Sequence, residues 1–219
     1  MKIKYLGHAA FVLTSQGGTR IVLDPYEAGA YGGAVGYPPI DETAEIVLLS
    51  HDHPDHGYAQ AVKGRDRKVI SSPATTSVGE INISGVSTFH DESQGSERGG
   101  NIIFTVEMDG LKVTHLGDLG HPLSEKEVAE IGQPDVLLVP VGGYFTIDAS
   151  SASKIVERLA PRIVIPMHYK TECCGFPIAP IDGFLQGKEN VKKLGQEVEV
   201  SKESLPEAGE IWVLQHPAP

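Results

Sequence analysis

The segment SHDHPDHG, residues 50–57, constrains the fold more than any other part of the chain. Three histidines and two aspartates lie between His51 and His56, directly after the apolar run EIVLL. The apolar run predicts a buried strand, and a strand that ends in imidazoles and carboxylates presents them at one edge of a sheet. These groups are ligands for Zn²⁺, Fe and Mn²⁺. The segment is therefore either a histidine-rich surface loop or part of a metal site, and its composition favours the metal site.

The spacing within this segment suggests two ions. In an extended chain His51 and His53 point to the same side, so both can reach one ion. Pro54 turns the chain, and we expect Asp55 and His56 to serve a second ion beside the first.

Three further candidate ligands close later apolar runs. His90 ends VSTFH, Asp118 ends KVTHLGD and His168 ends RIVIPMH. Functional residues gather at strand ends in layered folds. A carboxylate has two oxygens, so Asp118 can bridge two ions. The expected first site is His51, His53 and His90, and the expected second site is Asp55, His56 and His168.

The rest of the chain reads as short strands interleaved with helices. Turns are predicted at Gly17-Gly18 and at residues 109–110. Helices are predicted over residues 123–132, with Ser124 as N-cap, and over residues 149–160, with Asp148 as N-cap. A helix over residues 184–195 and a short helix over residues 58–64 are also predicted. Residues 25–42 form a long loop rich in glycine and proline. No linker divides the chain, so we expect one layered α/β or α+β domain over residues 1–219.

Composition narrows the function. The chain has 219 residues, is 40% hydrophobic and carries a formal net charge of −11, which argues against nucleic acid as a partner. No apolar run approaches the ~20 residues that cross a bilayer, so we expect a cytoplasmic protein with no membrane partner. Cys173 and Cys174 are adjacent, which argues against a disulfide framework and fits a reducing compartment, but the sequence does not give their role.

The motif HDHPDH matches HxHxDH, the signature of the metallo-β-lactamase superfamily, and the later order His90, Asp118, His168 also resembles that family. The segments YLGHAAFVL, LDP, PVGG and PMHY resemble its branch of small metal-dependent hydrolases that includes ascorbate-6-phosphate lactonase. The resemblance implies an α+β fold, a four-layer αββα sandwich with a two-metal site between the sheet edges. It also places His8 and Asp24 near that site, as substrate-binding or ligand-orienting residues, although each reads equally well as an ordinary strand-end or turn residue.

We therefore expect a binuclear metal-dependent hydrolase. A hydroxide shared by two divalent ions, with zinc expected and manganese or iron as alternatives, would cleave an ester, lactone, amide or phosphodiester bond of a small metabolite that could be anionic. Asp55 would bind metal and steer the nucleophile as the catalytic residue. The alternative is an iron-dependent redox enzyme of the mononuclear dioxygenase type on the same fold. A purely structural zinc site is disfavoured, because such sites are usually closed and four-coordinate. The sequence gives neither the substrate nor the oligomeric state.

Overall fold

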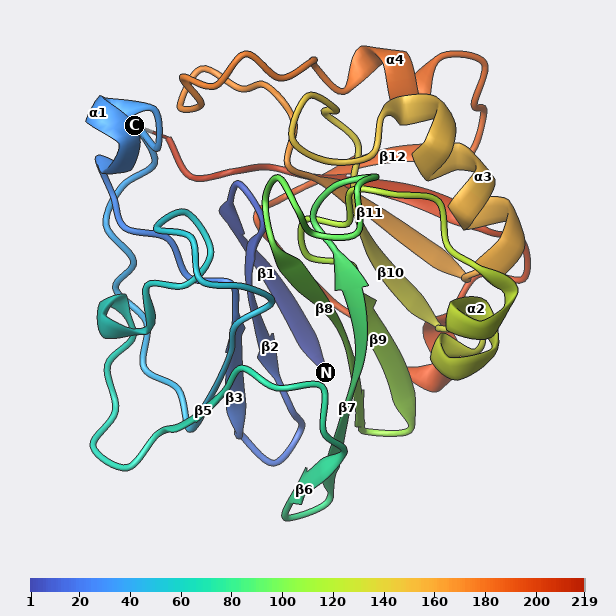
Figure 1. Cartoon of the computed structure of the whole chain (residues 1–219). Helices are drawn as coiled ribbons and strands as arrows, with labels where there is room; N and C mark the ends of the chain where they lie inside the picture. Colours follow the sequence, from blue (N-terminus) through green and yellow to red (C-terminus); the bar gives the residue numbers. More distant parts are fainter. Residues whose placement is uncertain (219) are drawn as a thin grey trace.

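Two β-sheets pack face to face in the computed structural model, which describes residues 1–218 (Figure 1). The first sheet has six strands, in the order β13 (Glu197–Glu199), β1 (Lys2–Gly7), β2 (Ala10–Thr14), β3 (Arg20–Leu23), β4 (Ile46–Leu48) and β5 (Lys68–Ile70). The second has eight, in the order β12 (Val191–Leu194), β14 (Glu210–Leu214), β11 (Ile163–Met167), β10 (Val136–Pro140), β9 (Leu111–His115), β8 (Gly100–Met108), β7 (Ile81–Phe89) and β6 (Thr76–Val78).

Both sheets mix parallel and antiparallel pairs. In the first, β3, β4 and β5 run parallel, and in the second β9, β10, β11, β14 and β12 run parallel. Strands β7 and β9 both pair antiparallel with β8, so they also run in one direction. The carboxyl ends of β7, β9 and β11 therefore lie at one edge of the second sheet.

The main core lies between the sheets. Side chains alternate along each strand, so Ile46 and Leu48 of β4 enter this core while Val47 faces outward. They pack in the same cluster as Phe104 of β8 and Ile165 of β11, which are fully buried. Each such side chain stabilises the fold by about 1.5–3 kcal/mol through burial.

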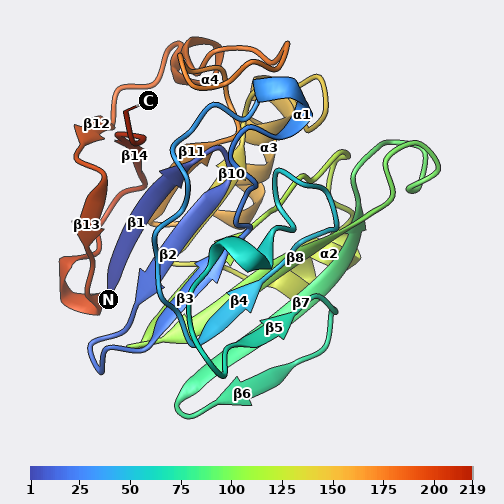
Figure 2. The ribbon, with the colours of Figure 1, turned by 90° about the vertical axis from the view of Figure 1, so that its left-hand side faces the viewer.

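Helices cover the outer face of one sheet, and mainly loops cover the outer face of the other. Helices α2 (Glu125–Ile131), α3 (Ala149–Leu159) and α4 (Asp182–Leu185) contribute to the core on the outer face of the eight-stranded sheet. Over the six-stranded sheet lie the short α1 (Ala30–Gly33), the 3₁₀ turn η1 (Ala59–Ala61) and long loops (Figure 2). A second 3₁₀ turn, η2 (Lys202–Ser204), precedes β14. The predicted αββα sandwich is confirmed, with one outer layer built mainly from loops.

Several local predictions hold and two are wrong. The hairpin turn at residues 109–110, the Ser124 capping box and the Asp148 N-cap are all present. The predicted helix over 58–64 is only the 3₁₀ turn η1. The predicted helix over 184–195 is also wrong, because Gly187 takes a left-handed φ of 74° and residues 191–194 then pair with β14 as β12. The gain from strand pairing outweighs local helix propensity here. No helix within residues 1–218 combines the length and the apolar character that crossing a bilayer would require.

Candidate metal centre

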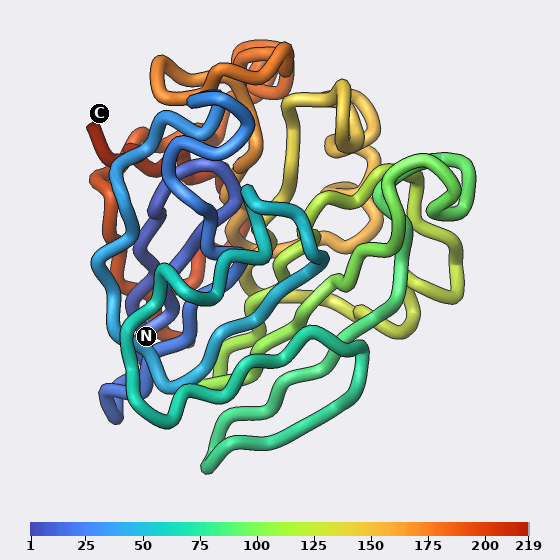
Figure 3. The backbone as a smooth tube through the Cα atoms, turned by 60° about the vertical axis from the view of Figure 1, so that its left-hand side comes forward, coloured from blue at the N-terminus to red at the C-terminus, as the bar shows by residue number. Residues whose placement is uncertain are grey.

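The seven predicted ligands converge at one edge of the sandwich. The segment 51–56 follows β4, and the other three residues follow β7, β9 and β11, namely His90, Asp118 and His168. Loops from distant parts of the sequence, around residues 30, 95 and 175, reach this same end of the molecule (Figure 3). The topology therefore joins residues that are far apart in the chain.

The donor atoms form two main groups. In each group every candidate ligand atom lies within 4.8 Å of the others. One group is His51, His53 and His90, and the other is His8, Asp55, His56 and His168. The two predicted sets of three thus recur in the structure, and His8 joins the second. A third group joins Asp24 to His51 of the first group and His56 of the second.

Asp118 lies where the two groups meet. Its Oδ2 is 3.2 Å from Nε2 of His90, 3.5 Å from Nε2 of His168 and 3.8 Å from Nε2 of His51. Its Oδ1 is 3.2 Å from Nε2 of His56. Burial would raise the pKa of Asp118, but the positive potential of His168 and His56 lowers it well below its usual range. Asp118 is therefore an ionised carboxylate with imidazole nitrogens of both groups within 3.8 Å of its oxygens.

Asp24 orients two of these imidazoles. Its Oδ1 accepts the Ser50 backbone N–H at 2.8 Å, and its Oδ2 accepts the Ser50 hydroxyl at 2.5 Å and Nδ1 of His56 at 3.0 Å. Because an ionised carboxylate can only accept, Nδ1 of His56 carries the proton. The Ser50 hydroxyl donates to Asp24, so it accepts from Nδ1 of His51 at 2.9 Å. In the neutral form that a metal ligand requires, both histidines therefore keep their lone pair on Nε2, which points into the donor groups.

These donor atoms fit a metal. Nε2 of His51, Nε2 of His56 and Oδ1 of Asp118 are buried and have no hydrogen bond within residues 1–218. An unpaired buried polar atom costs roughly 1–3 kcal/mol. Burial also lowers the pKa of His51 to about 3, which keeps that imidazole in the neutral form that a metal requires. A bound cation would pair with these atoms.

His8 lies against Asp55, with 3.1 Å between Nε2 and Oδ2. Burial lowers the pKa of His8, but hydrogen bonds to Asp55 and Cys174 together with the charge of Asp55 outweigh it, and the pKa is raised overall. The carbonyl of His8 accepts the Tyr5 hydroxyl at 2.9 Å and the backbone N–H of His168 at 2.8 Å. His8 is therefore close to the site, as the sequence resemblance implied, and its backbone also anchors His168.

The backbone is strained at the same place. His8, Asp24 and His168 have φ values of 55°, 44° and 52°, in the left-handed region that residues with a Cβ rarely adopt. Such conformations persist only where surrounding contacts hold them, and they cluster at functional sites.

Two glycines allow the close approach of backbone segments. A Cβ on Gly117, whose φ is 55°, would lie 2.3 Å from Oδ1 of Asn101, and a Cβ on Gly142 would lie 2.3 Å from the His168 carbonyl oxygen. The glycines of LGD and PVGG are therefore required by packing around Asp118 and His168.

Sequence reasoning missed three supporting residues. Ser50 is one of them, and its place between a strand and the HxH pair is the sequence signal for its role. Oδ1 of Asn101 accepts the Asp118 N–H at 2.9 Å, and Nδ2 donates to the Thr88 hydroxyl and the Leu116 carbonyl. Nothing in the sequence marks Asn101.

The third missed residue, Asp91, holds the loop that follows His90. Its carboxylate accepts the backbone N–H groups of residues 93, 95, 97 and 98. Burial would raise the pKa of Asp91, but these four N–H groups lower it to about 2. His115, at the end of β9, is hydrogen-bonded to the Ala9 carbonyl and accepts from the Gly117 N–H.

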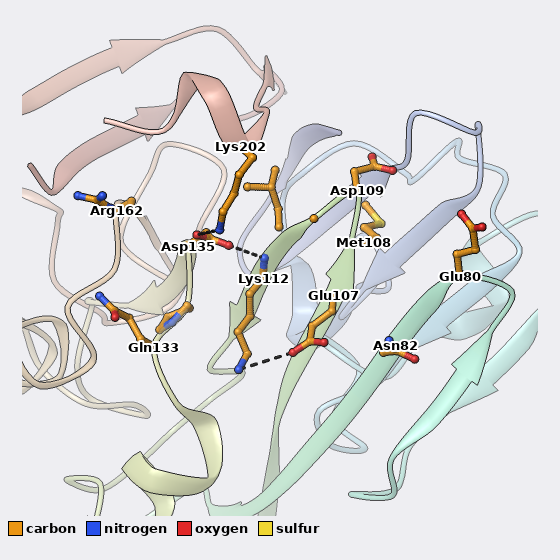
Figure 4. A pocket seen from close by; sticks show the side chains of 13 residues that line it. Glu80, Asn82, Glu107, Met108, Asp109, Lys112, Gln133, Asp135, Arg162 and Lys202 are labelled. Carbon is orange, nitrogen blue, oxygen red and sulfur yellow. Dashed lines mark hydrogen bonds and ion pairs between the residues drawn. The ribbon is translucent and has the colours of Figure 1, made fainter. Parts of the chain in front are cut away.

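A large cavity elsewhere has a different character. About 680 Å³ of space lies beside the β8–β9 turn, lined by residues such as Glu107, Lys112, Asp135 and Lys202 (Figure 4). The charges there pair with one another, as Lys202 does with Asp135 at 2.9 Å. Another cavity of about 680 Å³ is lined in part by Ser50 and His51, so open space adjoins the donor groups.

Comparison with known proteins agrees with this geometry. A family model described as the β-lactamase superfamily domain matches residues 2–168, the range that contains every candidate residue above. A UPF0173 metal-dependent hydrolase from Archaeoglobus fulgidus is 32% identical, over 91% of this chain and 94% of the relative. A solved structure from Thermotoga maritima, named as a candidate zinc-dependent hydrolase of the metallo-β-lactamase superfamily, is 38% identical, with a TM-score of 0.81 and 97% of each chain covered.

The same fold extends to more distant proteins. A metallo hydrolase from Ignicoccus hospitalis has a TM-score of 0.65 at 22% identity, over 100% of this chain and 96% of that one. The matched family model, together with relatives at 32% and 38% identity over almost the whole chain, shows that this chain belongs to the metallo-β-lactamase superfamily. Its relatives within that superfamily include the UPF0173 metal-dependent hydrolases.

Proposed function

We propose that this protein binds two divalent ions, with zinc as the expected metal, and hydrolyses an ester, lactone, amide or phosphodiester bond of a small metabolite. The first ion would be held by His51, His53 and His90, and the second by Asp55, His56 and His168, with Asp118 between them. When bound, the ions would supply positive charge and a water molecule whose pKa is lowered towards neutrality.

The residues of the chain have distinct parts in this proposal. Asp24 and Ser50 keep the lone pairs of His51 and His56 on Nε2. Asp55 would accept the proton of the attacking water, since its Oδ2 is 3.1 Å from Nε2 of His8, which can pass a proton on.

One observation carries the binuclear assignment. The carboxylate of Asp118 has imidazole nitrogens of both groups within 3.8 Å, and its Oδ1 has no hydrogen bond within residues 1–218. A single closed site would leave one of the two groups without a cation. The redox alternative uses overlapping ligands, and no contact in the site favours it over hydrolysis.

Metal counting tests the site. Protein purified without chelator should contain about two ions per chain by elemental analysis, and a His56→Ala, Asp118→Ala double variant should lose them. Asp52→Ala is the matched control, because Asp52 lies in the same segment but is exposed. A wild type that takes up no Zn²⁺, Mn²⁺ or Fe²⁺ would refute the metal assignment.

A substrate screen tests the reaction. Metal-replete protein should hydrolyse at least one member of a set of lactones, esters and phosphodiesters, and Asp55→Ala should be inactive. Iron in the purified protein together with oxygen uptake, and no hydrolysis, would favour the redox alternative instead.

A further inference from the structure

Aromatic side chains from three loops meet beside the candidate metal centre. The ring of Phe176 lies 5.6 Å from the ring of His8, 5.5 Å from that of Tyr31 and 5.7 Å from that of Phe145, between centroids. Tyr144 lies 4.7 Å from Phe145. We call Tyr31, Tyr144, Phe145 and Phe176 the aromatic mouth. It adjoins the donor groups directly, because His8 is hydrogen-bonded to Asp55.

Two of these rings are exposed in a way that folding does not explain. Tyr31 is 52% exposed and Tyr144 is 66% exposed, and they are two of the four large hydrophobic side chains exposed within residues 1–218. Both have left-handed backbone, with φ values of 52° and 65°. An exposed ring on strained backbone adds little to stability, so its position favours contact with a ligand.

A cation borders the mouth. The Arg98 guanidinium carbon lies 5.8 Å from the centroid of the Phe145 ring. The Arg98 backbone N–H donates to Asp91, and the His90 N–H donates to the carbonyl of Gly99. The loop that carries this cation is thus fixed to a candidate ligand. Nη1 of Arg98 also lies 3.8 Å from Oε2 of Glu97, whose side chain is 59% exposed, so this long ion pair leaves donors of the guanidinium for an anionic group of a ligand.

Tyr31 offers a hydrogen-bond donor within the aromatic mouth. Its hydroxyl can donate to an oxygen of a bound molecule.

We propose that the aromatic mouth binds a flat, apolar group of the substrate while Arg98 binds a carboxylate on that group, so that the substrate is an ester, lactone or amide of an anionic aromatic acid. This inference rests on the proposed function and narrows it. The occupant follows from the continuity of the mouth with the donor groups and from the positive charge at its border.

Matched esters test this on the metal-loaded full chain. Methyl phenylacetate and methyl cyclohexylacetate share a leaving group and a similar size, and only the first has a flat ring. We expect kcat/KM to be about two- to tenfold higher for the flat ring. Methyl 4-carboxyphenylacetate should gain up to about a further fivefold through Arg98.

Variants assign the two preferences. Phe176→Ala and Tyr144→Ala should each reduce the preference for the flat ring, and Arg98→Gln should remove the gain from the carboxylate. Tyr144→Ala guards against a folding defect, because that side chain is largely exposed. Val69→Ala and Lys126→Gln are matched controls on exposed residues away from the mouth, and they should change neither ratio.

A binding measurement separates this inference from the hydrolytic reaction. By isothermal titration, 1,4-phenylenediacetate should bind metal-loaded protein more tightly than 1,4-cyclohexanediacetate, and Arg98→Gln should weaken it. If these binding preferences are observed but no ester is hydrolysed, the proposed reaction is refuted and the proposed binding role of the aromatic mouth is supported. If esters are hydrolysed with no preference for a flat ring or a carboxylate, the binding role of the aromatic mouth is refuted and the proposed hydrolase activity is supported. A dimer that dissociates in Tyr144→Ala, with no ring preference, would also overturn it by showing a subunit interface.

Discussion

Replacing Asp24 by asparagine should weaken metal binding without removing any proposed ligand. Asp24 accepts three hydrogen bonds, from the Ser50 N–H, the Ser50 hydroxyl and Nδ1 of His56. An asparagine has one oxygen, which can keep the bond to the Ser50 N–H. Its NH₂ group then faces Nδ1 of His56, which must become an acceptor. The proton moves to Nε2, the atom that points into the donor groups.

The magnitude follows from this change of tautomer. Loss of such a supporting partner typically lowers metal affinity ~10–100-fold, or about 1.4–2.7 kcal/mol. If the amide turns round instead, the Ser50 N–H faces an NH₂ group and is left unpaired, which costs roughly 1–3 kcal/mol of folding stability. Either orientation therefore has a measurable effect.

Competition with a chromophoric chelator at fixed pH measures the affinity, and urea unfolding of the metal-free protein measures the stability. Asp52→Asn is the matched control, since Asp52 is exposed in the same segment. If Asp24→Asn binds Zn²⁺ within twofold of wild type and unfolds at the same urea concentration, the role assigned to Asp24 is refuted.

Four further outcomes are expected. Gly117→Ala should lower the free energy of unfolding in urea by more than Gly110→Ala does. Both glycines have a positive φ, but only the Cβ added at Gly117 would also collide with Asn101. Equal losses would show that this collision is relieved at no cost. Asp91 has a pKa of about 2 in the folded protein against 3.8 as its ordinary value, so its contribution to stability is present above about pH 4 and is lost as the pH falls through 2. The urea midpoint of Asp91→Asn should therefore fall less steeply between pH 4 and pH 2 than that of wild type, and parallel curves would contradict this. Phe104→Ala should cost about 3–5 kcal/mol by urea unfolding, since the ring is fully buried between the sheets; a loss below 1 kcal/mol would mean that the core collapses around the gap. Adding Zn²⁺ at about 100 times its Kd should stabilise the metal-free protein by about 2.7 kcal/mol for each ion bound, and an unchanged thermal midpoint would argue against binding to the folded state.

The positions of the donor residues could be anticipated from the sequence because they sit at the ends of apolar runs. A strand that ends at Ser50 must present the next residues at the sheet edge, and the same holds for His90 and His168. The layered fold followed from strands interleaved with capped helices, as at Ser124 and Asp148.

Other features depend on tertiary contacts and have no local signal. The side chain of Asn101 supports Asp118 only because β8 passes beside the end of β9. The left-handed φ of His168 is held by a hydrogen bond from its N–H to the carbonyl of His8, in the turn that follows β1 of the other sheet. The segment 191–194 has a sequence suited to a helix, and only the presence of β14 makes it a strand. The aromatic mouth likewise has no local signal, because it forms only where three loops that are distant in sequence meet in the folded chain.

The edge strand β13 has a consequence for how the protein is made. It pairs with β1, so residues 197–199 complete a sheet whose other strands lie within residues 2–70. Contacts so distant in sequence form slowly, because a long loop must close first. During synthesis the segment 51–56 therefore exists before the residues that face it, at a stage when its histidines can capture whichever cation is abundant. The identity of the metal in the folded protein would then depend on whether the cation binds before or after folding is complete. Refolding with competing metals present, compared with adding the same metals after refolding, would test this by the metal content of the two samples.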